Sequence, residues 1–137
     1  MPPVFSLTVM APEQTIFRGK ARSLVAPGSE GYLGVLAHHA PMVTELRIGR
    51  LTIVEEAGAR RLFALSGGIL ETGGNQATIL ADSAEPAQEI DLARAEAAEQ
   101  RAKDRISRNG EDLDVARAQA ALERALNRLR VAQAGRG

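Results

Sequence analysis

Two pairs of charged residues in the last third of the chain could together bind an anion. Asp91 and Arg94 are three residues apart, and Arg124 and Arg128 are four apart, so on helices each pair would share a face. Two arginines at this spacing repel by about 0.2–0.5 kcal/mol unless a negative group lies between them. A helical hairpin could bring the three guanidiniums around a phosphate chain. From spacing alone the alternative stays open, namely that Asp91 only caps a helix and the arginines form a solvated face.

The usual catalytic motifs are incomplete in this sequence. The segment around Ser66 lacks the first glycine of a G-x-S-x-G elbow, so we interpret Ser66 as a polar residue ahead of a hairpin. Gly19 and Lys20 are followed by alanine, without the serine or threonine of a phosphate-binding loop. His38 and His39 are adjacent, and no nearby carboxylates complete a metal site, so we interpret them as loop or interface residues. The sequence therefore predicts a protein that is not an enzyme and requires no cofactor or metal.

The composition excludes several classes of function. The 137 residues are 45% hydrophobic and 25% charged, which is typical of one small domain or of a domain with an appendage. Because 17 basic residues balance 17 acidic ones, no general cationic field draws the chain to nucleic acid or anionic lipid. The absence of cysteine excludes disulfides and thiolate metal sites. No apolar run approaches the roughly 20 residues that span a bilayer, and the first ten residues do not resemble a signal peptide.

The composition changes sharply near residue 84. Every proline, threonine and aromatic residue lies at or before residue 86, whereas alanine, leucine, arginine and glutamate dominate the rest of the chain. β-Branched and aromatic residues favour strands, whereas alanine, leucine, arginine and glutamate favour helices. We therefore predict a β-domain over residues 1–84 and a two-helix domain over residues 85–137.

The first part has the pattern of an antiparallel β-sandwich of about nine or ten strands. Short apolar segments recur every eight to twelve residues, with glycine-rich turns between them, and no crossover helix for a parallel sheet fits. We expect hairpin turns at Gly58, at Gly67 and Gly68, and at residues 73–75. The predicted strands cover residues 4–10, 15–17, 21–26, 31–36, 42–48, 50–55, 60–66, 69–72 and 77–81.

The second part has the pattern of a helical hairpin. Helices are predicted over residues 91–108 and 112–134, separated by Asn109, Gly110 and Glu111, with Asp91 and Asp112 (or Asp114) as N-caps. The apolar stripe on each helix is narrow and rich in alanine. Burying alanine stabilises much less than burying leucine, so we expect a hairpin that can open or re-dock at modest cost.

The most specific pattern covers residues 27–46, PGSEGYLGVLAHHAPMVTEL. It resembles the signature of the epsilon subunit of F-type ATP synthases, P-G-x-x-G-x-L-G-V-L-P-x-H-A-P-L-x-T-x-L. Ser66, Gly67 and Gly68 ahead of residues 75–80 are also similar to that family, as is a β-sandwich followed by two helices. The resemblance covers essentially the entire chain. The sequence departs from the family at Ala37 and His38, where proline and then glycine or another small or polar residue are usual.

The resemblance implies a non-catalytic rotor subunit in the central stalk of a proton- or sodium-translocating F-type ATP synthase. It implies a β-domain that docks on the gamma subunit and on the c-ring, with His38, His39 and Pro41 at the partner interface. It also implies helices that reach the alpha and beta subunits and inhibit ATP hydrolysis. The expected location is the cytoplasmic face of the plasma membrane, as a peripheral subunit. A stand-alone β-sandwich adaptor with a coiled-coil recruiting arm is the alternative.

The same resemblance implies a regulatory ATP site. In several bacterial members of the family, the pattern I/L-D-x-x-R-A, together with arginines on the last helix, is associated with ATP binding. The matching residues here, which the resemblance implies as nucleotide-binding, are Glu85, Ile90, Asp91, Arg94, Ala95, Arg124 and Arg128.

Overall fold

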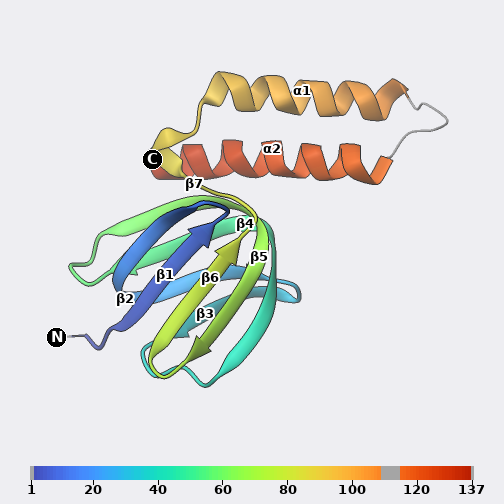
Figure 1. Cartoon of the computed structure of the whole chain (residues 1–137). Coiled ribbons are helices and arrows are strands. Elements are labelled where there is room, and N and C mark those ends of the chain that lie inside the picture. Colours follow the sequence, from blue (N-terminus) through green and yellow to red (C-terminus); the bar gives the residue numbers. More distant parts are fainter. Residues whose placement is uncertain (1, 109–114, 137) are drawn as a thin grey trace.

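The computed structural model describes residues 2–108 and 115–136. It confirms the predicted order, a β-domain followed by two helices, and the helices lie side by side along one end of the β-domain (Figure 1). The strands are β1 (Phe5–Ala11), β2 (Gln14–Gly28), β3 (Gly31–Leu36), β4 (Met42–Glu55), β5 (Arg60–Gly73), β6 (Gln76–Ala81) and β7 (Ala84–Pro86). A short 3-10 helix η1 (Ala87–Glu89) leads to α1 (Leu92–Arg108) and α2 (Val115–Arg136).

The sheet closes on itself. Its strands are hydrogen-bonded in the order β1-β6-β5-β4-β2, and β2 pairs again with β1, while β3 pairs with β2 and β7 with β5. The prediction of a wholly antiparallel sheet is wrong, because β1 and β6 pair in parallel. No crossover helix is needed, since three of the strands between them in the chain, β2, β4 and β5, complete the ring.

The predicted count of nine or ten strands is also wrong, because the described residues form seven. β2, β4 and β5 each join two predicted segments into one long strand. In β5 the predicted turn at Gly67 and Gly68 lies inside the strand, where both residues have positive φ angles of 113° and 152°. A Cβ on Gly68 would lie 2.3 Å from the Leu80 carbonyl oxygen, so glycine here allows β6 to approach closely while β5 continues through both residues. β7 was not predicted, and it extends the sheet beyond residue 84.

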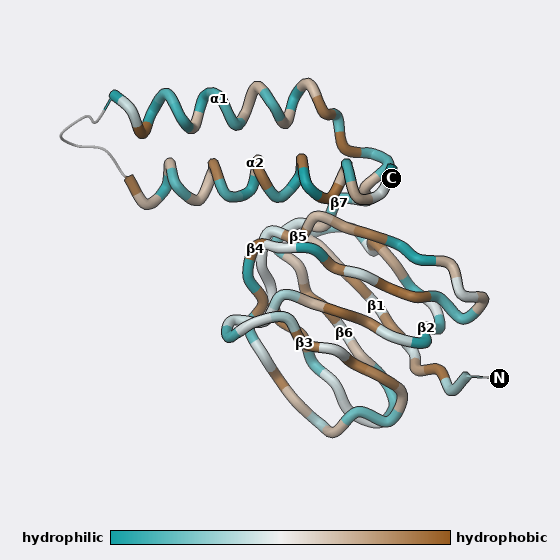
Figure 2. The backbone as a smooth tube through the Cα atoms, turned by 180° about the vertical axis from the view of Figure 1, so that it is seen from behind, coloured by the Kyte–Doolittle hydropathy of each residue, from teal (hydrophilic) through white to brown (hydrophobic). Residues whose placement is uncertain are grey.

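Buried side chains that alternate along the strands fill the inside of the closed sheet. In β1, Phe5, Leu7 and Val9 are buried, as their period of two predicts. Figure 2 shows hydrophobic stretches along the strands, whereas α1 is interrupted throughout by hydrophilic residues. The main core contains Ala84 but no residue after it. Its other buried residues are Phe17, Ala21, Leu24, Ala26, Val35, Leu46, Leu51, Ile53, Phe63, Leu65, Leu70, Ala77, Ile79 and Ala81.

The two helices pack in layers on the β-domain. α2 lies against β4, β5 and η1, and α1 packs on the outer side of α2 (Figure 1). The side chains buried on the helices are mostly alanine: Ala95, Ala102, Ala118, Ala125, Val131 and Ala132. The predicted turn residues Asn109, Gly110 and Glu111, and the predicted caps Asp112 and Asp114, lie outside the described residues. Within the described ranges, residues 2–108 and 115–136, no helix is long and apolar enough to cross a membrane.

Candidate functional site

A groove of about 780 Å³ runs between α2 and the β-domain. Arg124, Asn127 and Arg128 of α2 form one wall, and Glu85 and Glu89 form part of the other. The β-domain contributes the remaining wall with Ala11, Pro12, Gln14, Thr15, Ile16, Ala64, Leu65, Ser66, Asp82, Ser83, Ala84 and Pro86. The structure therefore places three of the predicted nucleotide-binding residues, Glu85, Arg124 and Arg128, around one hollow. Guanidiniums and carboxylates both face it, so the groove has no single sign of charge.

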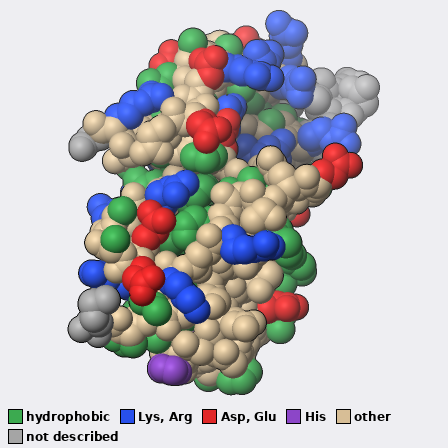
Figure 3. Space-filling model, turned by 60° about the vertical axis from the view of Figure 1, so that its left-hand side comes forward, with side chains coloured by type: hydrophobic (Ala, Val, Ile, Leu, Met, Phe, Trp, Pro, Cys, Tyr) green, Lys and Arg blue, Asp and Glu red, His purple; other side chains and the backbone are tan. Residues whose placement is uncertain are grey.

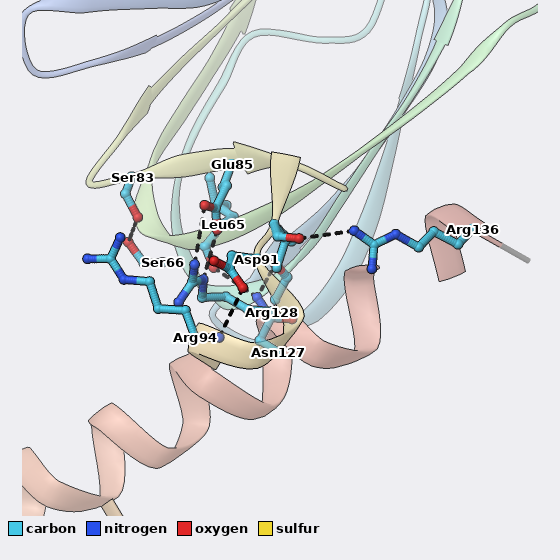
Figure 4. A network of polar contacts seen from close by, with 11 residues as sticks. Leu65, Ser66, Ser83, Glu85, Asp91, Arg94, Asn127, Arg128 and Arg136 are labelled. Carbon is cyan, nitrogen blue, oxygen red and sulfur yellow. Dashed lines mark hydrogen bonds and ion pairs between the residues drawn. The ribbon is translucent and has the colours of Figure 1, made fainter. Parts of the chain in front are cut away.

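Glu85 and Arg128 form a two-point ion pair across this groove (Figure 4). Arg128 Nε donates to Glu85 Oε1 at 2.8 Å, and Arg128 Nη2 donates to Oε2 at 3.3 Å. The two side chains are 27% and 35% exposed, so the net contribution to stability is at most about 1 kcal/mol. The pair joins β7 to α2. It engages the guanidinium of Arg128, one of the three that we predict to bind phosphate.

Asp91 caps α1, as predicted. The backbone N–H of Arg94 donates to Asp91 Oδ1 at 3.1 Å, and the N–H of Ala95 donates to the Asp91 carbonyl oxygen at 3.0 Å. Ile90 and Ala95, on either side of this cap, are buried in a small cluster with Val131. Their burial fixes the start of α1 and thereby positions Asp91 and Arg94.

The three arginines differ in what they contact. Arg128 is paired with Glu85, whereas in the described part of the chain neither Arg94 nor Arg124 has a carboxylate partner. Arg124 lines the groove beside Arg128, while Arg94 is exposed at the start of α1 and does not line it. In this structure two guanidiniums thus share the groove, and the binding of a nucleotide by all three stays a prediction.

Asn127 is a contact residue that the sequence analysis missed. Its Nδ2 donates to the Gly49 carbonyl oxygen at 2.9 Å and to the Leu65 carbonyl oxygen at 3.3 Å, so it ties the middle of α2 to β4 and β5 (Figure 4). The available signal was an asparagine within a run of good helix formers, where its low helix propensity suggests another role. Beside it, Ser66 lies within β5 and shares a 2.6 Å hydrogen bond with the Ser83 hydroxyl.

The predicted partner-interface residues lie in the loop between β3 and β4, at the end of the β-domain that Figure 3 shows opposite the helices. His38 has a positive φ of 64°, and its backbone N–H donates to Asn75 Oδ1 at 2.8 Å. His39 Nδ1 lies 2.8 Å from the Ala40 carbonyl oxygen. Pro41 is exposed. Hydrogen bonds thus fix the loop despite its departure from the family pattern, and across residues 2–108 and 115–136 no cluster of three metal-ligating residues occurs.

Two protein-family models together match nearly the whole chain. The β-sandwich domain of the ATP synthase delta/epsilon chain matches residues 4–87. The long α-helix domain of the same chain matches residues 88–133.

Individual proteins show the same similarity. The ATP synthase epsilon chain of Desulforamulus reducens is 42% identical over 127 residues, covering 93% of this chain and 96% of that protein. The epsilon chain of Salinibacter ruber is 48% identical over 135 residues, covering 93% and 91%. A chain from the Euglena gracilis mitochondrial ATP synthase, in a structure of OSCP, F1 and c-ring, superposes with a TM-score of 0.79 at 26% identity over 90% of this chain and 78% of that one. A chain from the central stalk and c-ring of the Tetrahymena thermophila enzyme shares the fold, with a TM-score of 0.56 at 18% identity over 95% of each chain.

Proposed function

Because this chain belongs to the epsilon chain family of F-type ATP synthases, in which it is a non-catalytic subunit, we propose that it regulates the complex from the central stalk. In this proposal the β-domain docks on the gamma subunit and on the c-ring, with His38, His39 and Pro41 at that interface. The hairpin of α1 and α2 inhibits ATP hydrolysis by reaching the alpha and beta subunits. The subunit lies at the cytoplasmic face of the plasma membrane. The match of two epsilon chains along 93% of this chain supports this function over a stand-alone adaptor.

The observation that carries the proposal is the way in which the helices are attached. α1 packs mainly on α2, and α2 meets the β-domain through a small cluster around Val131, one asparagine and one partly exposed ion pair. This cluster is much smaller than the main core and the ion pair is partly exposed, so the contacts stabilise docking only modestly. The main core of the β-domain contains no residue of either helix. The hairpin can therefore leave the β-domain without opening that core.

We further propose that ATP holds the hairpin in the compact form. The groove supplies Arg124, which has no carboxylate partner among the described residues, and Arg128, whose partner Glu85 a phosphate group could replace. Arg94 is free to turn toward the same ligand from α1. A ligand that binds the compact form in preference to the open form shifts the population by its differential affinity. ATP binding at this groove would therefore reduce inhibition by the helices.

Deleting residues 87–137 is expected to leave assembly intact. Leu62 and Ala64, which pack against Ala87 and the end of α2, are the main apolar side chains that this deletion uncovers, and both lie outside the main core. The shortened chain should fold and co-purify with gamma as the full chain does. A folded but non-binding fragment would contradict docking through the β-domain, and an unfolded fragment would contradict the division into two units.

A further inference from the structure

The last turn of α2 lies in unusually close contact with η1. A Cβ placed on Gly135 would lie only 2.4 Å from the Ala87 Cβ, a separation that real side chains do not adopt. Ala87 is fully buried. Glycine is therefore the residue that fits at this position of the last turn, where α2 and η1 approach closely.

A second contact lies one residue further along. Arg136 Nη2 donates a hydrogen bond to the Ile90 carbonyl oxygen at 3.0 Å, and Figure 4 draws this contact as a dashed line from Arg136. Ile90 is itself buried, beside Val131 and Ala132 of α2. The end of α2 thus touches the connector of residues 87–91 at both Ala87 and Ile90.

This connector is the covalent link between the β-domain and the helices. It runs from the end of β7 to the start of α1, so its backbone angles must change if the hairpin swings away. Through Gly135 and Arg136 the end of α2 holds the same residues that would have to move. Neither Gly135 nor Arg136 lines the groove with Arg124 and Arg128.

We propose that Gly135 and Arg136 form a hinge lock, which keeps the connector in its compact conformation without nucleotide. The inference rests on the proposed mobility of the hairpin and adds a second point of control to it. ATP in the groove beside Arg124 and Arg128 would hold the middle of α2, whereas the hinge lock holds its end. Opening then requires the end of α2 to withdraw from the connector first, and any factor that loosens this turn opens the hairpin at constant ATP.

Matched valine substitutions in the full chain test the hinge lock. Gly135→Val places a side chain against Ala87, whereas Ala134→Val adds a β-branched residue at the neighbouring exposed position of the same turn. The chain has no cysteine, so Glu71→Cys on β5 and Gln119→Cys on α2 accept spin labels uniquely. Without ATP, Gly135→Val should increase the open fraction, seen as longer label distances, by about tenfold or more. Ala134→Val should leave the distances near those of the wild type.

A third variant separates failure of the hinge lock from failure of the proposed mobility. Val131→Asp buries a charge under α2 and should detach the hairpin in any case. If Val131→Asp opens the hairpin and Gly135→Val does not, or if Ala134→Val opens it equally, the hinge lock is wrong. If all three variants keep the compact distances, the mobile hairpin itself is wrong. Circular dichroism checks that each variant retains its helices and strands. Arg136→Ala removes only the hydrogen bond to Ile90 and should increase the open fraction less than Gly135→Val does.

Discussion

Replacing Arg124 with alanine is expected to weaken ATP binding about ten- to a hundredfold, because a charge-assisted hydrogen bond contributes roughly 1.5–3 kcal/mol. Arg124 lines the groove and has no carboxylate partner among the described residues, so its removal breaks no ion pair of the compact form. Calorimetric titration of the full-length variant with ATP measures the change. Binding to gamma should be unaffected, since Arg124 lies on the helices.

Arg130→Ala is the matched control for this prediction. Arg130 is also an exposed arginine of α2, but it faces a different hollow, beside Tyr32 and Arg50. Equal ATP affinity of the Arg124→Ala and Arg130→Ala variants would contradict the proposed site. Arg128→Ala is a less direct test, because it also removes the pair with Glu85 and leaves that carboxylate alone in the groove.

Removing residues 87–137 is expected to raise ATP hydrolysis by the assembled complex about fivefold or more, the scale of a typical coupling between sites. α2 carries one acidic residue, Glu123, against five arginines, Arg117, Arg124, Arg128, Arg130 and Arg136. Such a helix suits an acidic surface on the catalytic subunits. Because exposed charges are screened by salt, the difference between full-length and shortened chains should shrink as ionic strength rises.

Steady-state hydrolysis by complexes with the full-length chain, with the shortened chain and with neither chain tests this expectation. The complex lacking the chain shows whether the shortened chain has lost inhibition completely or has lost assembly. Equal rates with full-length and shortened chains at both low and high salt would contradict an inhibitory hairpin in this protein.

Local chemistry made the main elements predictable. The alternation of Phe5, Leu7 and Val9 places β1, and Asp91 ahead of an alanine-rich run places the start of α1. Long-range geometry was less predictable. Glycines such as Gly67 and Gly68 signal a turn in sequence, yet in β5 they take positive φ angles within one continuous strand. Closure of the sheet pairs β1 with β6, through contacts between residues that are about 70 apart in sequence. The hydrophobic periodicity of a single segment does not show which distant segment it pairs with.

The candidate site shows the same division. Four-residue spacing correctly places Arg124 and Arg128 on one side of α2, where both reach the groove. It carries no information about the partner across the groove, because Glu85 precedes Arg128 by 43 residues and approaches it only when α2 docks. The close approach of Gly135 to Ala87 is likewise a product of docking. Spacing thus identifies the residues of a shared face, while the tertiary fold decides which of them are already paired.

Calorimetric titration of the wild-type chain with ATP shows whether the compact hairpin of this epsilon chain binds nucleotide. We expect saturable binding of one ATP per chain, which Arg124→Ala abolishes or strongly weakens and Arg130→Ala retains. The absence of saturable binding at millimolar ATP would contradict it, and would leave Arg94 and Arg124 as solvated charges and Arg128 as the partner of Glu85 alone.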